Sequence, residues 1–257
     1  KAACEGRLVP TEAELARAEG RAYESGSALL ARILAERRAR WEQANPGKRY
    51  VEPKAPAVDG LAELPEGWVW ARVGQICELG TGATPLRSKA KYWDDGTIPW
   101  ITSGALNDLW IDHATQYITE IAVQETNVKI FPKGTLLVAM YGEGKTRGKV
   151  SELRLDATTN QACAALITSG VSRDVKAYLK LFLQGNYEDI RRLSSGGVQP
   201  NLNLSIVRDT LFPLPPLAEQ HRIVSEVERR LSVVQEVEGV VAAGLRRAER
   251  LRQSILK

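Results

Sequence analysis

The amino-acid sequence predicts a mixed α/β (α+β) domain that is followed by one long helix able to form a coiled coil and is preceded by a helical segment. Short β-type runs alternate with turn-rich loops through the middle of the chain, and its last part has no proline but carries apolar residues at heptad spacing. The 257 residues include 44% hydrophobic and 26% charged residues, a composition typical of folded proteins with a full core. We therefore divide the chain into residues 1–66, 67–216 and 217–257.

The first region is expected to be helical and then extended. Residues 1–44 are rich in Ala, Glu and Arg, which favour helices, and Leu30, Ile33 and Trp41 recur at helical spacing. Residues 45–66 contain repeated Pro and Gly, which break helices and favour an extended chain. This pattern predicts an N-terminal helical segment and a Pro-rich connector.

The middle region, residues 67–216, is expected to hold the mixed α/β domain. One helix is predicted over Val175–Gly185, because its apolar residues share a face. The β-type runs are short and rich in apolar residues, and Gly, Pro and Asp separate them. These runs are Trp68–Val73, Ile98–Ile101, Thr135–Met140 and Ala162–Ile167.

The last region, residues 217–257, is expected to be one helix that needs a partner. Apolar residues follow alternating steps of three and four, which is the pattern of a coiled coil. Glu238 and Arg252 occupy the two remaining positions of the seam and could set its register. The residues expected to pair with another helix are Val227, Leu231, Val234, Glu238, Val241, Leu245 and Arg252.

Charge and cysteine content narrow the class of protein. The net charge of +4 permits binding to nucleic acid without requiring it. No apolar run approaches the roughly 18–20 residues of a membrane span, and the three cysteines are too far apart in sequence for a disulfide framework. We expect a soluble intracellular (cytoplasmic) protein with no membrane partner. Because the only methionine is Met140, we also expect the chain to be a fragment or a trimmed form.

One glycine-rich loop could indicate an enzyme. Gly142–Thr146 follows a predicted strand and resembles a loop that binds nucleotide phosphates, or the end of a nuclease motif. The context does not match, because the sequence continues as a strand where a phosphate-binding loop would open a helix. The alternative is a hairpin tip that carries Lys145, Arg147 and Lys149 toward phosphate groups. A nucleotide-dependent or nuclease module therefore remains the second hypothesis.

Polar loops in the middle region are the candidate DNA-binding sites. Arg and Lys can contact guanine or phosphate, and Gln and Asn can contact adenine through two hydrogen bonds. Composition alone leaves open that these are ordinary solvated loops. No catalytic group or metal site is expected, since the only histidines are His113 and His221. The candidates are Thr84, Arg87, Lys89, Lys91, Tyr92, Lys145, Arg147, Lys149, Gln199 and Asn201.

Several motifs, taken in order, decide between these hypotheses. They are Leu64–Trp70, Gly82–Pro85, Tyr92–Trp93, Ile98–Ile101, Thr159–Ala162, Gly197–Leu202 and Leu214–Ile223. Together with the heptad helix that follows, they resemble the specificity (S) subunit of type I restriction–modification enzymes. Each motif is weak by itself, but their order over residues 64–257 is specific.

The resemblance implies a non-catalytic subunit that reads one half of a two-part DNA target. It also implies docking to methyltransferase (M) subunits, which carry S-adenosylmethionine, and assembly with a motor and nuclease (R) subunit. No cofactor is expected in this chain. Trp41 is the candidate anchor for the methyltransferase, because buried aromatic residues carry much of an interface's energy. A pure coiled-coil scaffold is the third hypothesis.

The two ends of the chain resemble parts of one repeat. Lys1–Pro10 is similar to the segment that follows the conserved helix in this family, while the chain ends on such a helix. We therefore expect one recognition domain, where a full subunit has two. The long helix would then pair with a second copy, or with the missing first conserved helix.

Overall fold

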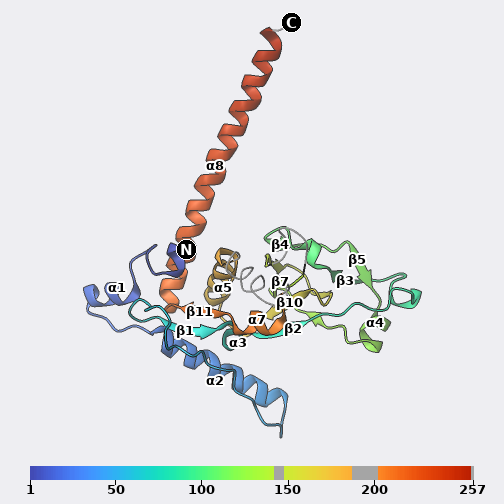
Figure 1. Ribbon diagram of the computed structural model, residues 1–257, viewed down its shortest axis with the longest axis horizontal. Coiled ribbons are helices and arrows are strands. Elements are labelled where there is room, and N and C mark those ends of the chain that lie inside the picture. The colour runs from blue at the N-terminus through green and yellow to red at the C-terminus, as the bar shows by residue number, and fades with distance from the viewer. Residues whose placement is uncertain (142–147, 187–201, 256–257) are drawn as a thin grey trace.

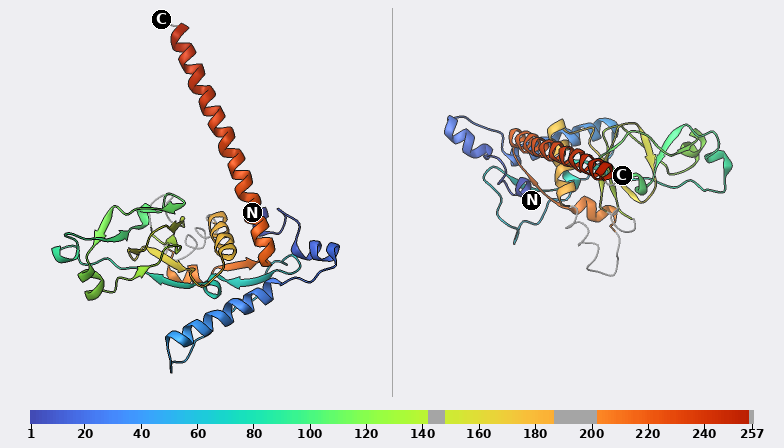
Figure 2. Two further views of the ribbon diagram at one scale, coloured as in Figure 1. Left: turned by 180° about the vertical axis from the view of Figure 1, so that it is seen from behind. Right: turned by 90° about the horizontal axis from the view of Figure 1, so that it is seen from above.

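The computed structural model describes residues 1–141, 148–186 and 202–255 of the chain. One long helix rises from a body of small sheets and helices, and the N-terminus lies beside the base of that helix (Figures 1 and 2). The mixed α+β fold predicted from the sequence is confirmed, including the long C-terminal helix.

The strands of the described residues form three sheets. In the first, β1 (Val69–Arg72) pairs antiparallel with β11 (Leu211–Leu214), which joins the start and the end of the middle region. The second sheet has the order β2 (Glu78–Thr81), β10 (Cys163–Ile167), β7 (Leu136–Ala139), β8 (Val150–Leu153) and β4 (Trp110–Ile111). The third has the order β5 (Gln116–Ile118), β3 (Ile98–Ile101), β9 (Ala157–Thr159) and β6 (Ile130–Phe131).

The central strands β7 and β10 bury both of their faces. Because successive side chains of a strand point to opposite sides, Leu136 and Val138 enter one core cluster while Leu137 and Ala139 enter another. Strands of this kind appear in sequence as continuous apolar runs. This is why β7 and β10 were predicted to within a residue or two at each end.

Among the described residues, five helices cover or flank the sheets, besides α8 and short turns of helix. The first core cluster contains residues of α5, which begins at Arg173 as the sequence predicts to within two residues. Helix α2 packs Leu29, Leu30 and Ile33 into the same cluster, beneath β1 and β11 (Figure 1). Their bounds are α1 (Glu12–Glu19), α2 (Gly26–Ala44), α4 (Glu120–Glu125), α5 (Arg173–Gly185) and α7 (Leu204–Asp209). The short turns are α3 (Val73–Ile76), η1 (Ala2–Cys4), η2 (Ala90–Tyr92) and η3 (Ser103–Ala105).

The long helix α8 (Leu217–Ile255) is buried only at its base. Ile223 is fully buried, and α5 packs against this part of α8. From Leu231 onward the apolar side chains are exposed, and the predicted seam residues Leu231, Val234, Val241 and Leu245 are 51 to 62% exposed. Val233, Val237 and Val240 add a second exposed apolar row that the heptad prediction did not include. No described helix is long and apolar enough to cross a membrane.

A buried network of charges connects the N-terminal segment to the base of α8. The Glu219 carboxylate accepts hydrogen bonds from the Glu12 backbone N–H at 2.8 Å and from the Trp68 indole N–H at 3.0 Å. The buried Glu12 carboxylate pairs with Arg21 at 2.5 Å and with Arg222 at 2.7 Å. Burial raises the pKa of Glu219 above its ordinary value. The direction in which α8 leaves the body is therefore set by groups from three separate parts of the chain.

The chain passes between the second and third sheets through the loop of residues 82–97, which we call the β2–β3 loop. Gly82 begins this loop and lies directly against β9. A Cβ atom at Gly82 would overlap the backbone carbonyl of Thr159, which cannot move without disturbing the pairing of β9 with β3. The close approach of these two backbones therefore requires a residue without a side chain.

We expect Gly82→Ala to lower the free energy of unfolding by about 1–3 kcal/mol, the usual cost of overpacking. Thermal or urea unfolding of the purified chain measures this loss. Gly185→Ala is the control, because no described atom lies within 4 Å of a Cβ atom there and Ala favours a helix more than Gly, so that variant should be at least as stable as the wild type. Equal stability of the two variants would contradict the close approach of Gly82 to β9.

Candidate nucleic-acid interface

Five of the ten predicted DNA-binding residues lie on the β2–β3 loop. This loop projects at the end of the body that lies away from α8, next to β3, β5 and α4 (Figure 1). Lys149 lies just before β8, where its amine donates to the Asn107 side chain at 2.9 Å. The remaining candidates, Lys145, Arg147, Gln199 and Asn201, lie outside the described residues.

Two tryptophans hold the backbone of the β2–β3 loop. The indole N–H of Trp100, on β3, donates to the carbonyl of Ala83 at 3.0 Å. The indole N–H of Trp93, on the loop itself, donates to the carbonyl of Leu86 at 3.3 Å. The two rings meet at a right angle, with centroids 5.2 Å apart. We call this pair of rings the tryptophan corner.

Arg87 lies in the tryptophan corner. The central carbon of its guanidinium is 3.8 Å from the Trp93 ring centroid and 4.8 Å from that of Trp100. One of its N–H groups donates to the side-chain oxygen of Gln116, on β5, at 2.7 Å. Arg87 is exposed, and it forms no ion pair with any residue that the structure describes. Its positive charge is thus fixed in place without a nearby negative charge.

The other cations of the loop are arranged differently. Lys91 forms an ion pair with Glu125, on α4, at 2.6 Å, and this hydrogen bond raises the pKa of Lys91 and lowers the pKa of Glu125. The Tyr92 hydroxyl donates to the same carboxylate at 2.9 Å, and the Lys89 amine donates to that hydroxyl at 3.3 Å. The loop therefore carries one compensated lysine, Lys91, and two cations, Lys89 and Arg87, that form no ion pair with any described residue.

Tyr92 differs from the sequence-based prediction. Its side chain is only 4% exposed and belongs to a small core with Trp100, Ile118 and Ala122. The ring faces cannot stack on a base, because β3, β5 and α4 supply the residues around them. Tyr92 supports the loop from inside.

Two glutamines that were not predicted lie among the candidate residues. The Thr84 hydroxyl donates to the side-chain oxygen of Gln161 at 2.7 Å, and both side chains are exposed. Gln161 belongs to the sequence motif Thr159–Ala162, so the motif could have indicated it as a candidate DNA-binding residue. Gln116 had no such signal, since only the pairing of β5 with β3 brings it to Arg87.

A second group of cations surrounds Trp110, an exposed residue of β4. The Lys180 amine lies 3.2 Å from the Trp110 ring centroid, and the Arg154 guanidinium carbon lies 4.3 Å from it. Glu152 pairs with Lys176 at 2.8 Å and with Lys180 at 3.2 Å. Burial lowers the pKa of Lys180. A groove that continues onto the base of α8 is lined by Trp110, Glu152, Lys176 and Lys180.

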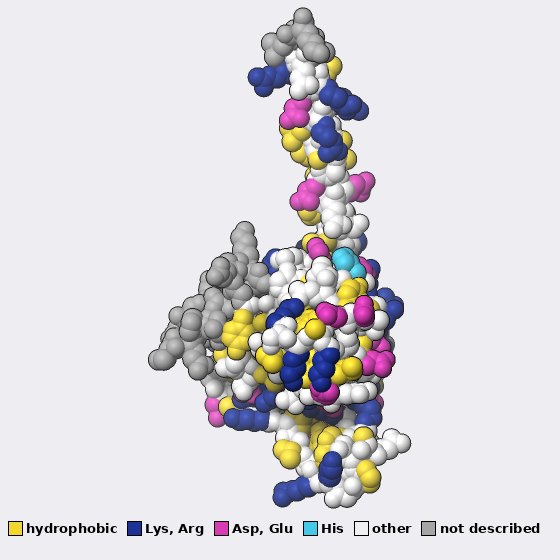
Figure 3. Space-filling view, turned by 90° about the vertical axis from the view of Figure 1, so that its right-hand side faces the viewer, with side chains coloured by type: hydrophobic (Ala, Val, Ile, Leu, Met, Phe, Trp, Pro, Cys, Tyr) yellow, Lys and Arg dark blue, Asp and Glu magenta, His cyan; other side chains and the backbone are white. Residues whose placement is uncertain are grey.

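Charges are mixed on the end of the body that carries the β2–β3 loop. Figure 3 shows Lys and Arg side chains beside hydrophobic and acidic side chains on this face. No single basic patch covers it. A contact with DNA would therefore depend on which individual cations lack an acidic neighbour.

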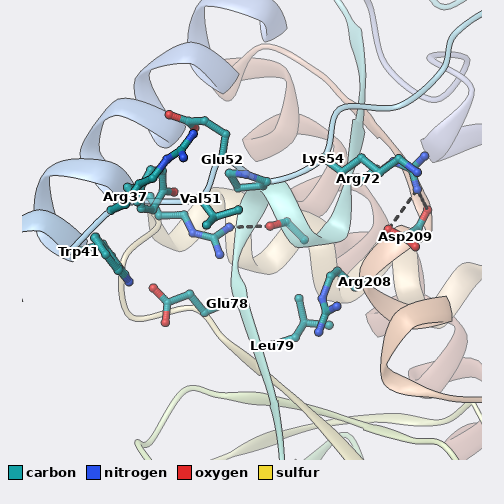
Figure 4. Close-up of a pocket in the computed structure, with 14 residues that line it drawn as sticks. Arg37, Trp41, Val51, Glu52, Lys54, Arg72, Glu78, Leu79, Arg208 and Asp209 are labelled. Carbon is teal, nitrogen blue, oxygen red and sulfur yellow. Dashed lines mark hydrogen bonds and ion pairs between the residues drawn. The ribbon is translucent and has the colours of Figure 1, made fainter. Parts of the chain in front are cut away.

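Trp41 lies near the end of α2, beside a surface pocket of about 510 Å³ (Figure 4). Its ring packs on Tyr50 of the same chain, with centroids 5.3 Å apart. Arg37 donates to the carbonyl of Gly74 at 2.5 Å, and Arg208 lines the opposite side of the pocket. Trp41 is half-buried, so part of its surface remains accessible from the pocket.

The nucleotide or nuclease hypothesis rests on the loop Gly142–Thr146, which lies outside the described residues. Among the residues that the structure describes, no group of three or more His, Cys, Asp or Glu side chains could hold a metal ion.

Comparisons with known proteins agree on one family. A family model described as the type I restriction modification DNA specificity domain matches residues 65–231. The MjaIX specificity subunit of Methanocaldococcus jannaschii is 31% identical over 170 residues, which are 64% of this chain and 38% of that protein. The EcoR124I/EcoR124II specificity subunit of Escherichia coli is 27% identical over 213 residues, which are 81% of this chain and 50% of that protein. The chain thus spans half or less of the length of these relatives.

Solved structures show the same fold. The HsdS subunit from Thermoanaerobacter tengcongensis aligns with a TM-score of 0.54 at 20% identity, over 84% of this chain and 50% of that one. A chain from a structure titled for complex assembly and conformational transition of the type I R-M system aligns with a TM-score of 0.56 at 21% identity, over 87% of this chain and 55% of that one. Since the family match covers most of the region between β1 and the first turns of α8, the chain belongs to the family of type I restriction–modification DNA specificity domains.

Proposed function

We propose that this chain is a non-catalytic specificity subunit, or half of one, that binds duplex DNA through residues 67–216 and reads one half of a two-part target. The observation that carries the proposal is the match of residues 65–231 to a DNA specificity domain. The exposed polar side chains of the β2–β3 loop and its neighbours support it, since Thr84, Arg87 and Gln161 are suited to contact DNA.

The candidate residues would divide two tasks. Lys145, Arg147 and Lys149 are proposed to contact phosphates, which fixes the position of a protein on DNA without reading sequence. Gln199 and Asn201 are proposed to contact base edges, because an amide offers a donor and an acceptor together. Lys149 would have to break its hydrogen bond to Asn107 to reach a phosphate. Lys89, which is exposed on the β2–β3 loop, has no such bond to Asn107 and is another candidate for a phosphate contact.

Selection of randomised duplexes with the chain, assembled with its modification partner, should enrich one short half-site. Lys145→Ala should weaken binding to all duplexes and reduce the salt slope by about one. Asn201→Ala should cost about 1–3 kcal/mol of discrimination at one or two base pairs and leave the salt slope nearly unchanged. The affinities of matched and single-mismatch duplexes, measured against salt, separate the two effects.

Two results would contradict this division. The absence of any enriched sequence would argue against a reader of DNA and favour the scaffold hypothesis. If Lys145→Ala and Asn201→Ala changed affinity and discrimination in the same way, the phosphate and base roles would be wrong. ATP binding by the chain that disappears in Lys145→Ala would instead support the nucleotide hypothesis.

We further propose that the chain docks a methyltransferase subunit, which would carry S-adenosylmethionine, and joins a motor and nuclease subunit in the full complex. The docking surface would consist of the outer face of α2, the pocket beside Trp41, and the exposed faces of α8. An accessible aromatic residue at the rim of a pocket is a typical centre of binding energy.

Trp41→Ala should weaken binding of the modification subunit by more than tenfold, because an aromatic centre of an interface contributes about 2 kcal/mol or more. Trp41→Phe keeps an aromatic contact with Tyr50 and is expected to retain most of the affinity. Titration calorimetry with the folded variants measures both. Unchanged binding in a folded Trp41→Ala variant would show that Trp41 only packs within its own chain.

The exposed stripe of α8 is proposed to pair antiparallel with a second copy of the chain or with another conserved helix. The amino-terminal half of α8 carries acidic and basic residues together, and Glu226 already pairs with Arg229 and Arg230. Charge therefore does not select the direction of pairing, and the antiparallel arrangement is what membership of this family implies. Polar residues in the seam, Glu238 and Arg252, would restrict the register.

Sedimentation should show a dimer of the isolated chain, and Leu245→Asn should shift it toward monomer. The reason is that a polar side chain in the seam removes apolar contacts along the whole interface. Ala243→Asn is the control, because residue 243 lies on the opposite side of the helix from residue 245. A strict monomer at high concentration would exclude pairing between copies.

A further inference from the structure

We propose that Arg87 binds a phosphate of duplex DNA at a fixed position, and that Trp93, Trp100 and Gln116 are the positioning residues that hold its guanidinium there. The inference rests on the proposed function and assigns one contact within it. It follows from three observations: the absence of an ion pair to Arg87 among the described residues, its fixed orientation, and its position against the tryptophan corner.

The charge of Arg87 is available to a ligand. Among the described residues it donates one hydrogen bond, to the neutral side chain of Gln116, and a guanidinium has five N–H donors. Lys91, four residues away on the same loop, has its charge balanced by Glu125 at 2.6 Å. An electrostatic contact with DNA therefore gains more from Arg87 than from Lys91.

The orientation of Arg87 is fixed before any ligand binds. The indole groups of Trp93 and Trp100 contact its guanidinium with their rings and hold the loop backbone with their N–H groups. The hydrogen bond from the Arg87 guanidinium to the side-chain oxygen of Gln116 restricts its rotation against the two rings. A long side chain normally loses conformational entropy when it binds, and here that cost is met when the protein folds. Such preorganisation is typical of a contact that sets position.

The same geometry favours a phosphate over a base. Base edges lie at the bottom of a major groove about 8.5 Å deep, so a side chain that reads them must extend away from the protein. Arg87 instead folds back into the tryptophan corner, 3.8 Å from the Trp93 ring centroid. Phosphates stand at the surface of the duplex, and a planar fork of N–H groups matches their oxygens. A guanidinium held against the tryptophan corner, at the protein surface, can meet them.

The experiment measures binding of the full 257-residue chain to a duplex of random sequence between about 50 and 200 mM salt. Arg87→Gln should weaken binding about tenfold at the lower salt, which corresponds to about 1.4 kcal/mol, and should reduce the salt slope by about 0.9. Arg87→Lys keeps the charge but loses the fork, so it should keep the slope and lose part of the affinity.

One control matches the loss of charge. Lys48→Gln removes one positive charge near the end of α2, away from the loop, and should leave the slope unchanged because only a local contact is proposed. Thermal unfolding of every variant reports whether the loop remains folded.

The positioning role of Trp93 is tested separately, by the affinity of Trp93 variants for DNA. Trp93→Phe keeps a ring beneath Arg87 and should bind nearly as the wild type does, whereas Trp93→Leu should weaken binding severalfold. In the Arg87→Gln background Trp93→Leu should add little further loss, because the two residues act through one contact. Additive losses would mean that Trp93 acts independently, and the positioning role would be wrong.

The outcomes separate this inference from the proposed function. Failure of the wild-type chain to bind duplex DNA at low salt would overturn both. Salt-dependent binding by the wild type, with Arg87→Gln indistinguishable from Lys48→Gln in slope, would overturn only the role of Arg87. A loss of discrimination between matched and mismatched duplexes without a change in slope would show that Arg87 reads a base, and would also overturn the phosphate assignment.

Discussion

The indole of Trp100 connects the parts of the molecule that form the candidate DNA-binding surface. As a residue of β3 it pairs with Gln116 on β5 and with Thr158 on β9, which places it at the centre of the third sheet. Its N–H group holds the carbonyl of Ala83, and its ring supports Arg87. The β2–β3 loop is thereby attached to the sheet at the carbonyl of Ala83 and at the side chain of Arg87. The positions of the exposed polar groups on the loop therefore depend on Trp100, which is itself buried.

Sequence patterns predicted those elements whose residues interact with near neighbours in the chain. β7 and β10 were recognised because burial on both faces leaves a continuous apolar run. The long helix α8 was recognised because its apolar stripe repeats at heptad spacing. Its second apolar row, with Val233 and Val237, was missed, because a heptad describes contact with one partner and does not account for a wider apolar face.

The candidate site was predicted less well, for a physical reason. The contact of Arg87 with Gln116 depends on how β3 and β5 pair, and no local pattern reports that pairing. Tyr92 looked like an exposed aromatic residue among lysines, but η2 is too short to have a periodic buried face, and α4 covers the ring. The basic character of the loop was readable from its sequence. Only the structure shows that Glu125 forms an ion pair with Lys91 and that no described acidic residue forms one with Arg87.

The buried charges at the base of α8 set the angle of a long helix, so a small change of angle there moves its far end by a large distance. A helix of 39 residues is about 58 Å long at 1.5 Å per residue, so a tilt of about 5° at its base displaces its tip by roughly 5 Å. The pairing of Glu12 with Arg222 and the bonds of Glu219 to Trp68 and to the Glu12 backbone therefore determine where the far end of α8 lies relative to the body. A small change in these buried contacts would be enlarged about tenfold along the helix.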